Sequence, residues 1–300
     1  MYNKLITNIK PLGFTWETGD PFLFCVHHLD HYPKANKNLG PAASLDGRNL
    51  GQDFTTKDGW RMYHGDTIPG FPAHPHRGFE TVTVVLDGFV DHSDSHGAAG
   101  RYGNGDVQWM TAGSGIVHEE FHSQQFTQKG GELEMVQLWV NLPARDKMTA
   151  ARYQALMNED IPVIELPDEA GRVRLIAGHF QGHTGAAETF SPIDVWDLRL
   201  NANKSGQLNV PEGHSLLIVA LDGDVRINGK KDLRAAQMAV LSTAGKNFSI
   251  STDSNAKLLV LSGRPLDEPV VGYGPFVMNS PEQIREAIND FQSGRFGRAF

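Results

Sequence analysis

The hydrophobic positions of this 300-residue chain fall into short runs rather than long periodic stretches. Four of these runs are rich in aliphatic and β-branched residues, and each is followed directly by Asp, Asn or Pro. Such runs predict β-strands at residues 81–86, 138–142, 195–200 and 215–221. The chain also contains 32 Gly and 16 Pro, which separate the short hydrophobic runs, and this arrangement is typical of β-sandwiches and β-barrels. The pattern therefore predicts an all-β protein.

Two segments carry a helical pattern instead. Ser280 is followed by Pro281 at the first helical position and Gln283 at the third, which is a capping-box arrangement. Apolar residues then recur at helical spacing, namely Ile284, Ala287, Ile288 and Phe291. We expect this C-terminal helix to lie with its apolar face across a barrel. A shorter helix is expected at residues 149–157, between the two halves of the chain.

Two short sequence matches recur in the same order. Residues 84–88 (VVLDG) resemble residues 219–223 (VALDG), and the tripeptide TAG occurs at residues 111–113 and 243–245. The offsets are 135 and 132 residues, so both matches are consistent with one duplicated barrel.

A length of 300 residues is about twice that of a usual domain, which agrees with a duplication. We predict an N-terminal domain at residues 1–145 and a C-terminal domain at residues 146–300.

Composition and charge exclude several classes of function. The formal net charge is −8 and no cluster of Lys or Arg interrupts the acidic balance, so direct nucleic-acid binding is not expected. No run approaches 18 apolar residues, and the N-terminal segment lacks the apolar stretch of a signal peptide. We therefore expect no membrane association and a cytoplasmic location. Cys25 is the single cysteine, which rules out an internal disulfide and a thiolate metal site.

The candidate chemistry lies in two short motifs. His74 and His76 are separated by one residue, so on an extended segment both imidazoles point to the same face. His118 and Glu120 repeat this geometry with an imidazole and a carboxylate. If the two segments lie side by side in a barrel, four ligands converge, and this set suits iron, nickel, manganese, copper or zinc.

Residues 118–122 (HEEFH) also match the H-E-x-x-H motif of zinc proteases, which requires an α-helix. Gly113 and Gly115 with the β-branched pair at residues 116–117 oppose a helix start and favour a turn into a strand. A strand places Glu119 on the face opposite His118, so we favour the metal site over the protease.

The second half of the chain provides an internal comparison. Aligned on the repeat matches, the four candidate ligands correspond to Asn209, Pro211, Ile250 and Thr252. Histidine and carboxylate are absent from all four positions, so the ligand set is specific to the first half. This asymmetry favours a dedicated site over a structural role that both copies would share.

Other side chains are weaker candidates. Glu80, four residues beyond His76, would share its face on one extended segment and could serve as a ligand or an acid–base group. His122 would share the face of Glu120. An aromatic pocket could be walled by Phe22, Phe24, Phe79, Trp109 and Met110. Solvent-facing or hydrogen-bonding roles are expected for His27, His28, His31, His64, His92, His96, His179 and His183, and a surface or packing role is expected for His214.

Longer strings of the sequence resemble the pirins, a family of the cupin superfamily. The resemblance rests on residues 74–82 (HPHRGFETV), 105–118 (GDVQWMTAGSGIVH), 137–142 (QLWVNL) and 274–279 (GPFVMN). It implies a bicupin fold of two stacked double-stranded β-helix (jelly-roll) barrels. It also implies one mononuclear ion, Fe(II) first, with Ni, Mn, Cu or Zn as alternatives, held by His74, His76, His118 and Glu120. Residues 34–66 form a longer insertion than the family leads us to expect.

The resemblance further implies quercetin 2,3-dioxygenase activity, in which O₂ opens the ring of a flavonol-like aromatic substrate. Glu120 is then our candidate proton acceptor. The alternative that the family implies is a non-catalytic iron-binding regulator that acts through protein partners. A purely structural or storage cupin is a third reading, and the asymmetric ligand set disfavours it.

Overall fold

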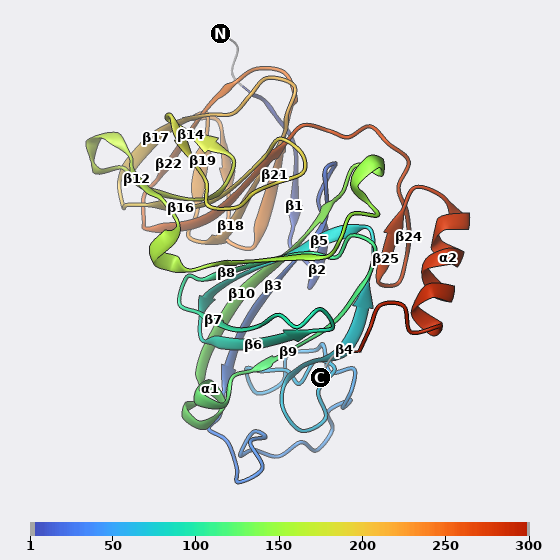
Figure 1. The fold of residues 1–300 in the computed structure, drawn as a ribbon. Coiled ribbons are helices and arrows are strands. Elements are labelled where there is room, and N and C mark those ends of the chain that lie inside the picture. Colours follow the sequence, from blue (N-terminus) through green and yellow to red (C-terminus); the bar gives the residue numbers. More distant parts are fainter. Residues whose placement is uncertain (1–3, 299–300) are drawn as a thin grey trace. The chain divides into compact units, whose positions relative to one another are not determined.

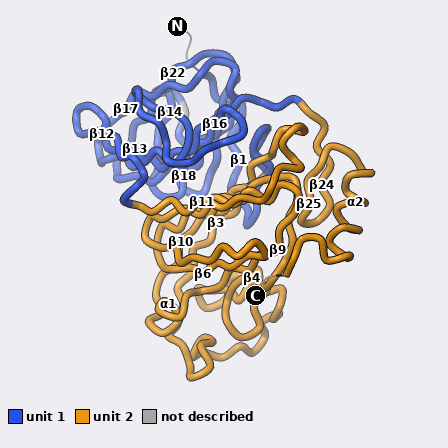
Figure 2. The backbone as a smooth tube through the Cα atoms, viewed as in Figure 1, with its two compact units in different colours: residues 1–23, 159–267 blue, residues 24–158, 268–300 orange. Residues whose placement is uncertain are grey.

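The computed structural model describes residues 4–298, which form two compact units (Figure 2). Unit 1 combines the chain up to residue 23 with residues 159–267, and unit 2 combines residues 24–158 with the chain from residue 268 onward. The inner junction lies 13 residues beyond the predicted boundary between residues 145 and 146. Each predicted domain was one continuous segment, whereas each unit takes a terminal segment from the opposite end of the chain.

Unit 1 is built from two main antiparallel sheets (Figure 1). Its strands are β1 (Ile6–Pro11), β2 (Thr15–Glu17), β12 (Val163–Glu165), β13 (Gly171–Ala177), β14 (His179–Phe180), β15 (His183–Thr184), β16 (Ile193–Leu200), β17 (Lys204–Asn209), β18 (Ser215–Asp222), β19 (Val225–Ile227), β20 (Lys231–Leu233), β21 (Gln237–Leu241), β22 (Asn247–Thr252) and β23 (Ala256–Gly263). The larger sheet has the order β1-β21-β18-β23-β16-β13-β12, and the smaller β17-β22-β19-β20. Aliphatic side chains of both sheets bury one continuous core. Strand β1 joins this unit because it pairs with β21.

Unit 2 has the same two-sheet plan. Its elements are β3 (Phe22–Tyr32), β4 (Gly70–His76), β5 (Phe79–Asp87), β6 (Phe89–Asp94), β7 (Ala99–Gly103), β8 (Val107–Thr111), β9 (Ile116–His122), α1 (Gln124–Lys129), β10 (Gly131–Asn141), β11 (Arg152–Leu156), β24 (Val271–Tyr273), β25 (Phe276–Met278) and α2 (Pro281–Gln292). The strands of this unit form the series β11-β8-β5-β10-β3 within one sheet and the order β4-β9-β6-β7 in the other. The all-β prediction is therefore confirmed.

The repeat found in the sequence marks the same turn in both units. Strands β5 and β18 end in Leu-Asp, and Gly88 and Gly223 follow at φ values of 83° and 75°. In each turn the Asp side chain accepts a hydrogen bond from the glycine amide, from Gly88 to Asp87 and from Gly223 to Asp222. The matching turns agree with a duplicated barrel.

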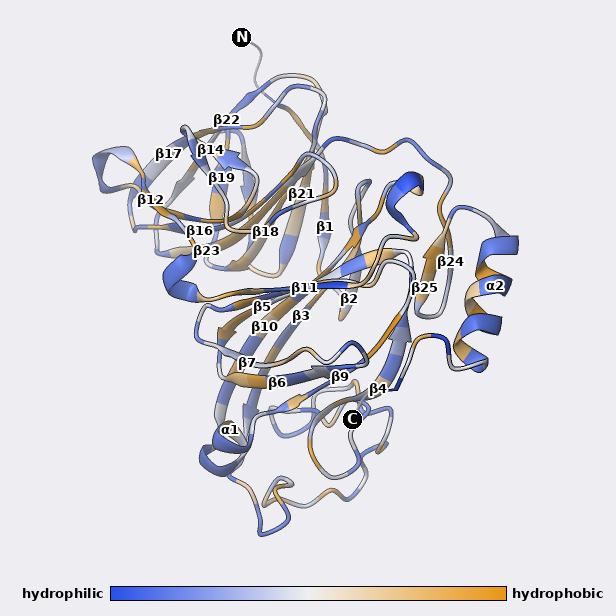
Figure 3. Cartoon of the chain, in the orientation of Figure 1, coloured by the Kyte–Doolittle hydropathy of each residue, from blue (hydrophilic) through white to orange (hydrophobic). Residues whose placement is uncertain are grey.

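The predicted C-terminal helix is confirmed as α2. The Ser280 side chain accepts a hydrogen bond from the amide of Gln283, as expected for an N-cap. Ile284 and Ala287 are buried against a cluster that includes Phe276, Met278, Val117 and Phe296. Figure 3 shows a mainly hydrophilic helix with a hydrophobic side. Within residues 4–298, no helix combines the length and apolar content that crossing a membrane would require.

The prediction of a short helix at residues 149–157 is wrong. Residues Arg152–Leu156 form strand β11, which pairs with β8 at the edge of a sheet, with Arg152 opposite Thr111 and Leu156 opposite Val107. Local helix propensity is weak compared with the hydrogen bonds that a free sheet edge offers, so pairing decides the conformation.

Candidate metal centre

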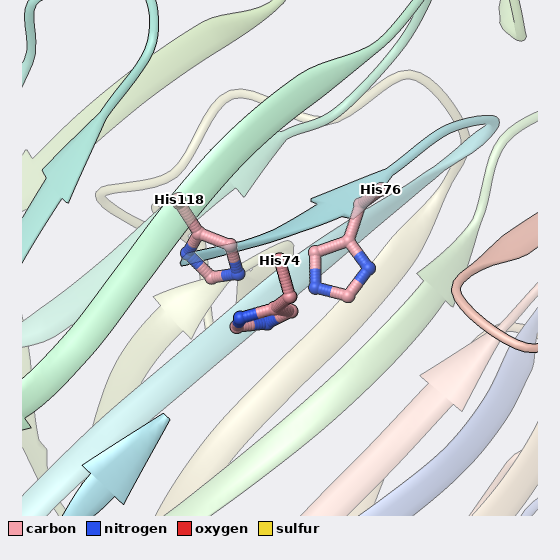
Figure 4. A group of neighbouring side chains, drawn as sticks. All are labelled: His74, His76 and His118. Atoms are coloured by element: carbon pink, nitrogen blue, oxygen red, sulfur yellow. The ribbon is translucent and has the colours of Figure 1, made fainter. Parts of the chain in front are cut away.

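Strands β4 and β9 bring three of the four predicted ligands together. His74 lies directly opposite His118 in the antiparallel register, and His76 is two residues further along β4. The ring centroids are 4.4 Å apart for His74 and His118, 4.8 Å for His74 and His76, and 4.9 Å for His76 and His118. One nitrogen of each ring lies within 4.8 Å of the others, and Figure 4 shows the three rings gathered together.

Burial keeps these imidazoles neutral. His76 and His118 are 4% and 0% exposed, while His74 is half-buried at the open side of the cluster. Burial lowers the pKa of His74 and lowers the pKa of His76 and His118 well below the ordinary value, and neighbouring imidazoles add to the effect. At neutral pH each ring therefore has one nitrogen lone pair available for a metal ion.

The hydrogen-bond partners show which nitrogen is available. His74 Nδ1 lies 2.8 Å from the carbonyl oxygen of Pro72, and His76 Nδ1 lies 3.4 Å from that of Pro275. A carbonyl only accepts hydrogen bonds, so each Nδ1 carries the proton and each Nε2 keeps its lone pair.

His118 Nε2 is buried and has no hydrogen-bond partner within the described part of the chain. A buried unsatisfied polar atom costs about 1–3 kcal/mol, and a metal ion at this position would remove that cost. Three neutral imidazoles around one point therefore fit a first-row transition ion.

The fourth predicted ligand, Glu120, lies on the same face of β9 but is less closely grouped. Its carboxylate lies within 4.8 Å of ligand nitrogens of His92 and His118, whereas the other cluster consists of His74, His76 and His118. Gln137 donates to Glu120 Oε2 at 3.0 Å, and Thr83 donates to Oε1 at 3.3 Å. These donors hold the carboxylate on the inner face of the barrel, where coordination by Glu120 stays a prediction.

His92 is the residue that sequence reasoning missed. It was expected to face solvent or make an ordinary hydrogen bond. Instead His92, on β6, is 3% exposed and lies directly opposite Glu120 of β9. In the structure Val90, His92 and Asp94 are all buried on one face of β6. The only signal in the sequence was the spacing of two residues between Val90 and His92, which places them on the same face of a strand.

One expectation at this site is corrected, and one rejection is confirmed. Glu80 does not share the face of His76, because β4 ends at His76 and a turn through Gly78, at φ 88°, leads into β5 in the other sheet. Glu80 accepts a hydrogen bond from Thr111 at 2.7 Å, and burial raises its pKa to about 7. The H-E-x-x-H interpretation fails because residues 116–122 form strand β9, whereas the motif requires a helix.

His122 packs in an aromatic environment away from the cluster. Its ring makes edge contacts with Tyr32 and Phe126 at centroid distances of 4.2 and 5.2 Å. Burial lowers the pKa of His122 to about 3, so the ring is neutral. His122 is in neither of the metal-ligand groups found within residues 4–298.

An aromatic wall adjoins His76. Phe79 stacks on Trp139 at a centroid distance of 4.0 Å, and Phe24 contacts the same indole at 4.2 Å. The imidazole of His76 lies 5.3 Å from Trp139 and 5.1 Å from Phe79. Phe24 and Phe79 of the expected wall are therefore present, with Trp139 as a member that was not expected.

Comparison with known proteins places both halves of the chain in one family. The family model described as "Pirin" matches residues 17–140, and "Pirin C-terminal cupin domain" matches residues 195–297. A Pseudomonas aeruginosa protein, provisionally named a quercetin 2,3-dioxygenase, is 55% identical over 230 residues, which cover 77% of this chain and 80% of that protein. A "Pirin-like protein" of Caulobacter vibrioides is 39% identical over 233 residues, covering 77% and 82%. The crystal structure of a quercetin 2,3-dioxygenase from Acinetobacter baumannii has 40% sequence identity, 99% coverage of both chains and a TM-score of 0.84.

Proposed function

The chain belongs to the pirin family of the cupin superfamily, and on that premise we propose that it is a metal-dependent dioxygenase that opens a flavonol ring with O₂. We propose that His74, His76, His118 and Glu120 hold one mononuclear ion. Fe(II) is the ion we expect, and the same donors also suit Ni, Mn, Cu and Zn.

The observation that carries this proposal is the lone-pair arrangement at the three histidines. All three rings are neutral, two have Nδ1 at a backbone carbonyl, and His118 Nε2 has no partner within residues 4–298. Together with Glu120, these three imidazoles leave up to about two positions of an octahedral ion for exogenous molecules, which is the usual condition for a catalytic rather than a structural ion.

The chain's own residues provide the remaining requirements of the reaction. Half-buried His74 marks the side of the cluster that solvent can reach. Trp139 and Phe24, both half-buried, provide an apolar surface beside His76 on which a planar aromatic substrate can stack, and buried Phe79 supports the indole from behind. Glu120, 4% exposed and oriented by Gln137 and Thr83, is the carboxylate that we assign to accept the proton of the flavonol hydroxyl. When bound, the ion supplies a Lewis acid that makes this hydroxyl more acidic.

The substrate class rests on two further observations. A relative that is 55% identical over 230 aligned residues is provisionally named a quercetin 2,3-dioxygenase, and a solved structure with 40% sequence identity carries that name. The aromatic wall supports the same class, because flavonols are planar and apolar on both faces.

Anaerobic reconstitution with Fe(II) tests the proposal. Wild type, His76→Ala and the control His183→Ala would be compared by metal analysis and by O₂ uptake with quercetin. His183 is exposed on β15 in unit 1. The His183→Ala variant therefore shows the effect of losing a histidine side chain that is not a proposed metal ligand. We expect one ion per chain and O₂ uptake with CO release in wild type and control, and the loss of both metal and uptake in His76→Ala.

The other outcomes are equally informative. Stoichiometric metal without turnover would contradict the dioxygenase and favour an iron-binding regulator that acts through a protein partner. Metal retained by His76→Ala would contradict the ligand set.

A further inference from the structure

His92 and Asp94 form a buried pair next to His118. The Nδ1 atoms of His92 and His118 are 3.4 Å apart, and His92 Nε2 lies 3.3 Å from Asp94 Oδ2. His92 is 3% exposed and Asp94 is 0% exposed. The ring of Tyr153 stacks on His92 at a centroid distance of 4.8 Å and an interplanar angle of 21°. The imidazole of His92 is therefore fixed in position.

The contacts of His92 determine where its proton lies. A carboxylate only accepts, so His92 Nε2 carries the proton and donates it to Asp94. His92 Nδ1 then has the lone pair, and Gln108 Nε2 donates to it at 2.7 Å. His118 Nδ1 lies 3.4 Å from the same His92 nitrogen. A lone pair on His118 Nδ1 would face the lone pair of His92 Nδ1 and be repelled by it, so His118 Nδ1 carries the proton and the lone pair of His118 is left on Nε2.

We propose that His92, oriented by Asp94, is the positioning residue that selects the metal-binding tautomer of His118. The inference deepens the proposed function, because it rests on His118 being a metal ligand. Metal-bound histidines usually donate their second N–H to a carbonyl or a carboxylate, and loss of such a partner typically weakens metal binding by 10- to 100-fold. For His74 and His76 this partner is a backbone carbonyl. For His118 it is the side chain of His92, so mutation can change it without touching a ligand.

Asp94→Asn is the sharpest test, because it changes the tautomer while keeping the shape. Asp94 Oδ1 accepts hydrogen bonds from the amides of His96 and Ala98, and the amide oxygen of Asn can keep both. The new NH₂ group would donate to His92 Nε2, which moves the His92 proton to Nδ1, and the Gln108 amide can rotate so that its oxygen accepts from this N–H. A proton on His118 Nδ1 would then face the N–H of His92, so the proton of His118 moves to Nε2, the atom that the metal needs.

Two measurements follow this change. Long-range ¹H–¹⁵N spectra of the metal-free chain report the tautomer of each histidine, and a Co(II) titration followed by d–d absorption reports the affinity. We expect an Nδ1–H tautomer for His118 in wild type, an Nε2–H tautomer in Asp94→Asn and a Kd for Co(II) that is at least about 10-fold higher in the variant. The matched control is Asp91→Asn on the same strand, where the half-exposed carboxylate pairs with Arg101, and we expect it to behave as wild type.

A second pair of variants covers the case that Asp94→Asn does not fold. His92→Asn can keep an acceptor near the former Nδ1, whereas His92→Leu keeps bulk but removes the acceptor. We expect near wild-type Co(II) affinity for the first and at least about 10-fold weaker binding for the second.

Three results would overturn the inference. They are an unchanged His118 tautomer in Asp94→Asn, equal Co(II) affinity in wild type and His92→Leu, or a loss in His92→Asn as large as that in His76→Ala. The third would make His92 a ligand itself. A wild-type chain that binds no Co(II) would overturn the metal centre and this inference together, which separates the failure of the proposed function from a failure confined to His92.

Discussion

Lys147 is a buried cation without a carboxylate partner in its hydrogen bonds. Its Nζ donates to the carbonyl oxygens of Gly78 at 2.8 Å and Val277 at 3.0 Å, and to Asn141 Oδ1 at 2.7 Å. The side chain thereby joins the turn after β4 to the C-terminal segment of unit 2. We predict that replacement by Met makes the stability of the protein less dependent on pH in the alkaline range.

The magnitude follows from the pKa. Burial lowers the pKa of Lys147 from 10.5 to about 8, although Glu268 acts to raise it. Between these values the unfolded chain binds the lysine proton more tightly than the folded chain, so the free energy of unfolding rises with pH. One pKa unit corresponds to about 1.36 kcal/mol, so the contribution of Lys147 should increase by roughly 2–3 kcal/mol from pH 7 to pH 10.

Urea unfolding at pH 7 and pH 10 measures this difference. Other groups titrate in the same range, so the informative quantity is the free energy of unfolding of wild type minus that of Lys147→Met. This difference should be larger at pH 10 by roughly 2–3 kcal/mol. Lys129→Met, at the exposed end of α1, should show no such increase. A difference that is constant with pH would refute the reasoning.

Three further predictions follow from single side chains. Burial raises the pKa of Glu80 to about 7, so its stabilising contribution is complete below the unfolded pKa of 4.5 and is lost as the pH rises to 7. The free energy of unfolding of Glu80→Gln should therefore exceed that of wild type by up to about 3 kcal/mol at pH 8, and by less at pH 4. As a control, Glu286→Gln on the surface of α2 should leave the free energy of unfolding unchanged in the same urea titrations. Ser280→Ala removes the N-cap of α2 and should lower the free energy of unfolding by about 1 kcal/mol, and an unchanged value would show that the cap contributes nothing. Gly78→Ala should lower the free energy of unfolding by more than about 2 kcal/mol, because residue 78 has φ 88° and a Cβ would collide with the carbonyl oxygen of Val277. A melting curve like that of wild type would contradict this prediction.

The features that could be predicted from the sequence depend on local signals. The cap at Ser280 and the alternation around His118 specify a helix and a strand within a few residues. The pairing of His74 with His118 was also predictable, because two same-face motifs needed only adjacent strands to meet.

The features that were missed depend on tertiary pairing. Residues 152–156 are a strand only because β8 offers them an edge. Glu80 was assigned to the wrong face because the turn at Gly78 resets the alternation between β4 and β5. The role of His92 depends on its opposition to Glu120 and its contact with His118, neither of which is visible in local sequence.

The exchange of terminal segments between the two units has a consequence for synthesis on the ribosome. Domains usually fold as they emerge, the N-terminal one first. Unit 2 cannot do so here, because its β24, β25 and α2 follow residues 159–267, which belong to unit 1. Until these elements emerge, Val117 lacks its apolar neighbours in the cluster with Phe276, and His76 lacks the carbonyl of Pro275. We therefore expect the three histidines of the nascent chain to bind a metal ion only after residues 271–292 have been translated.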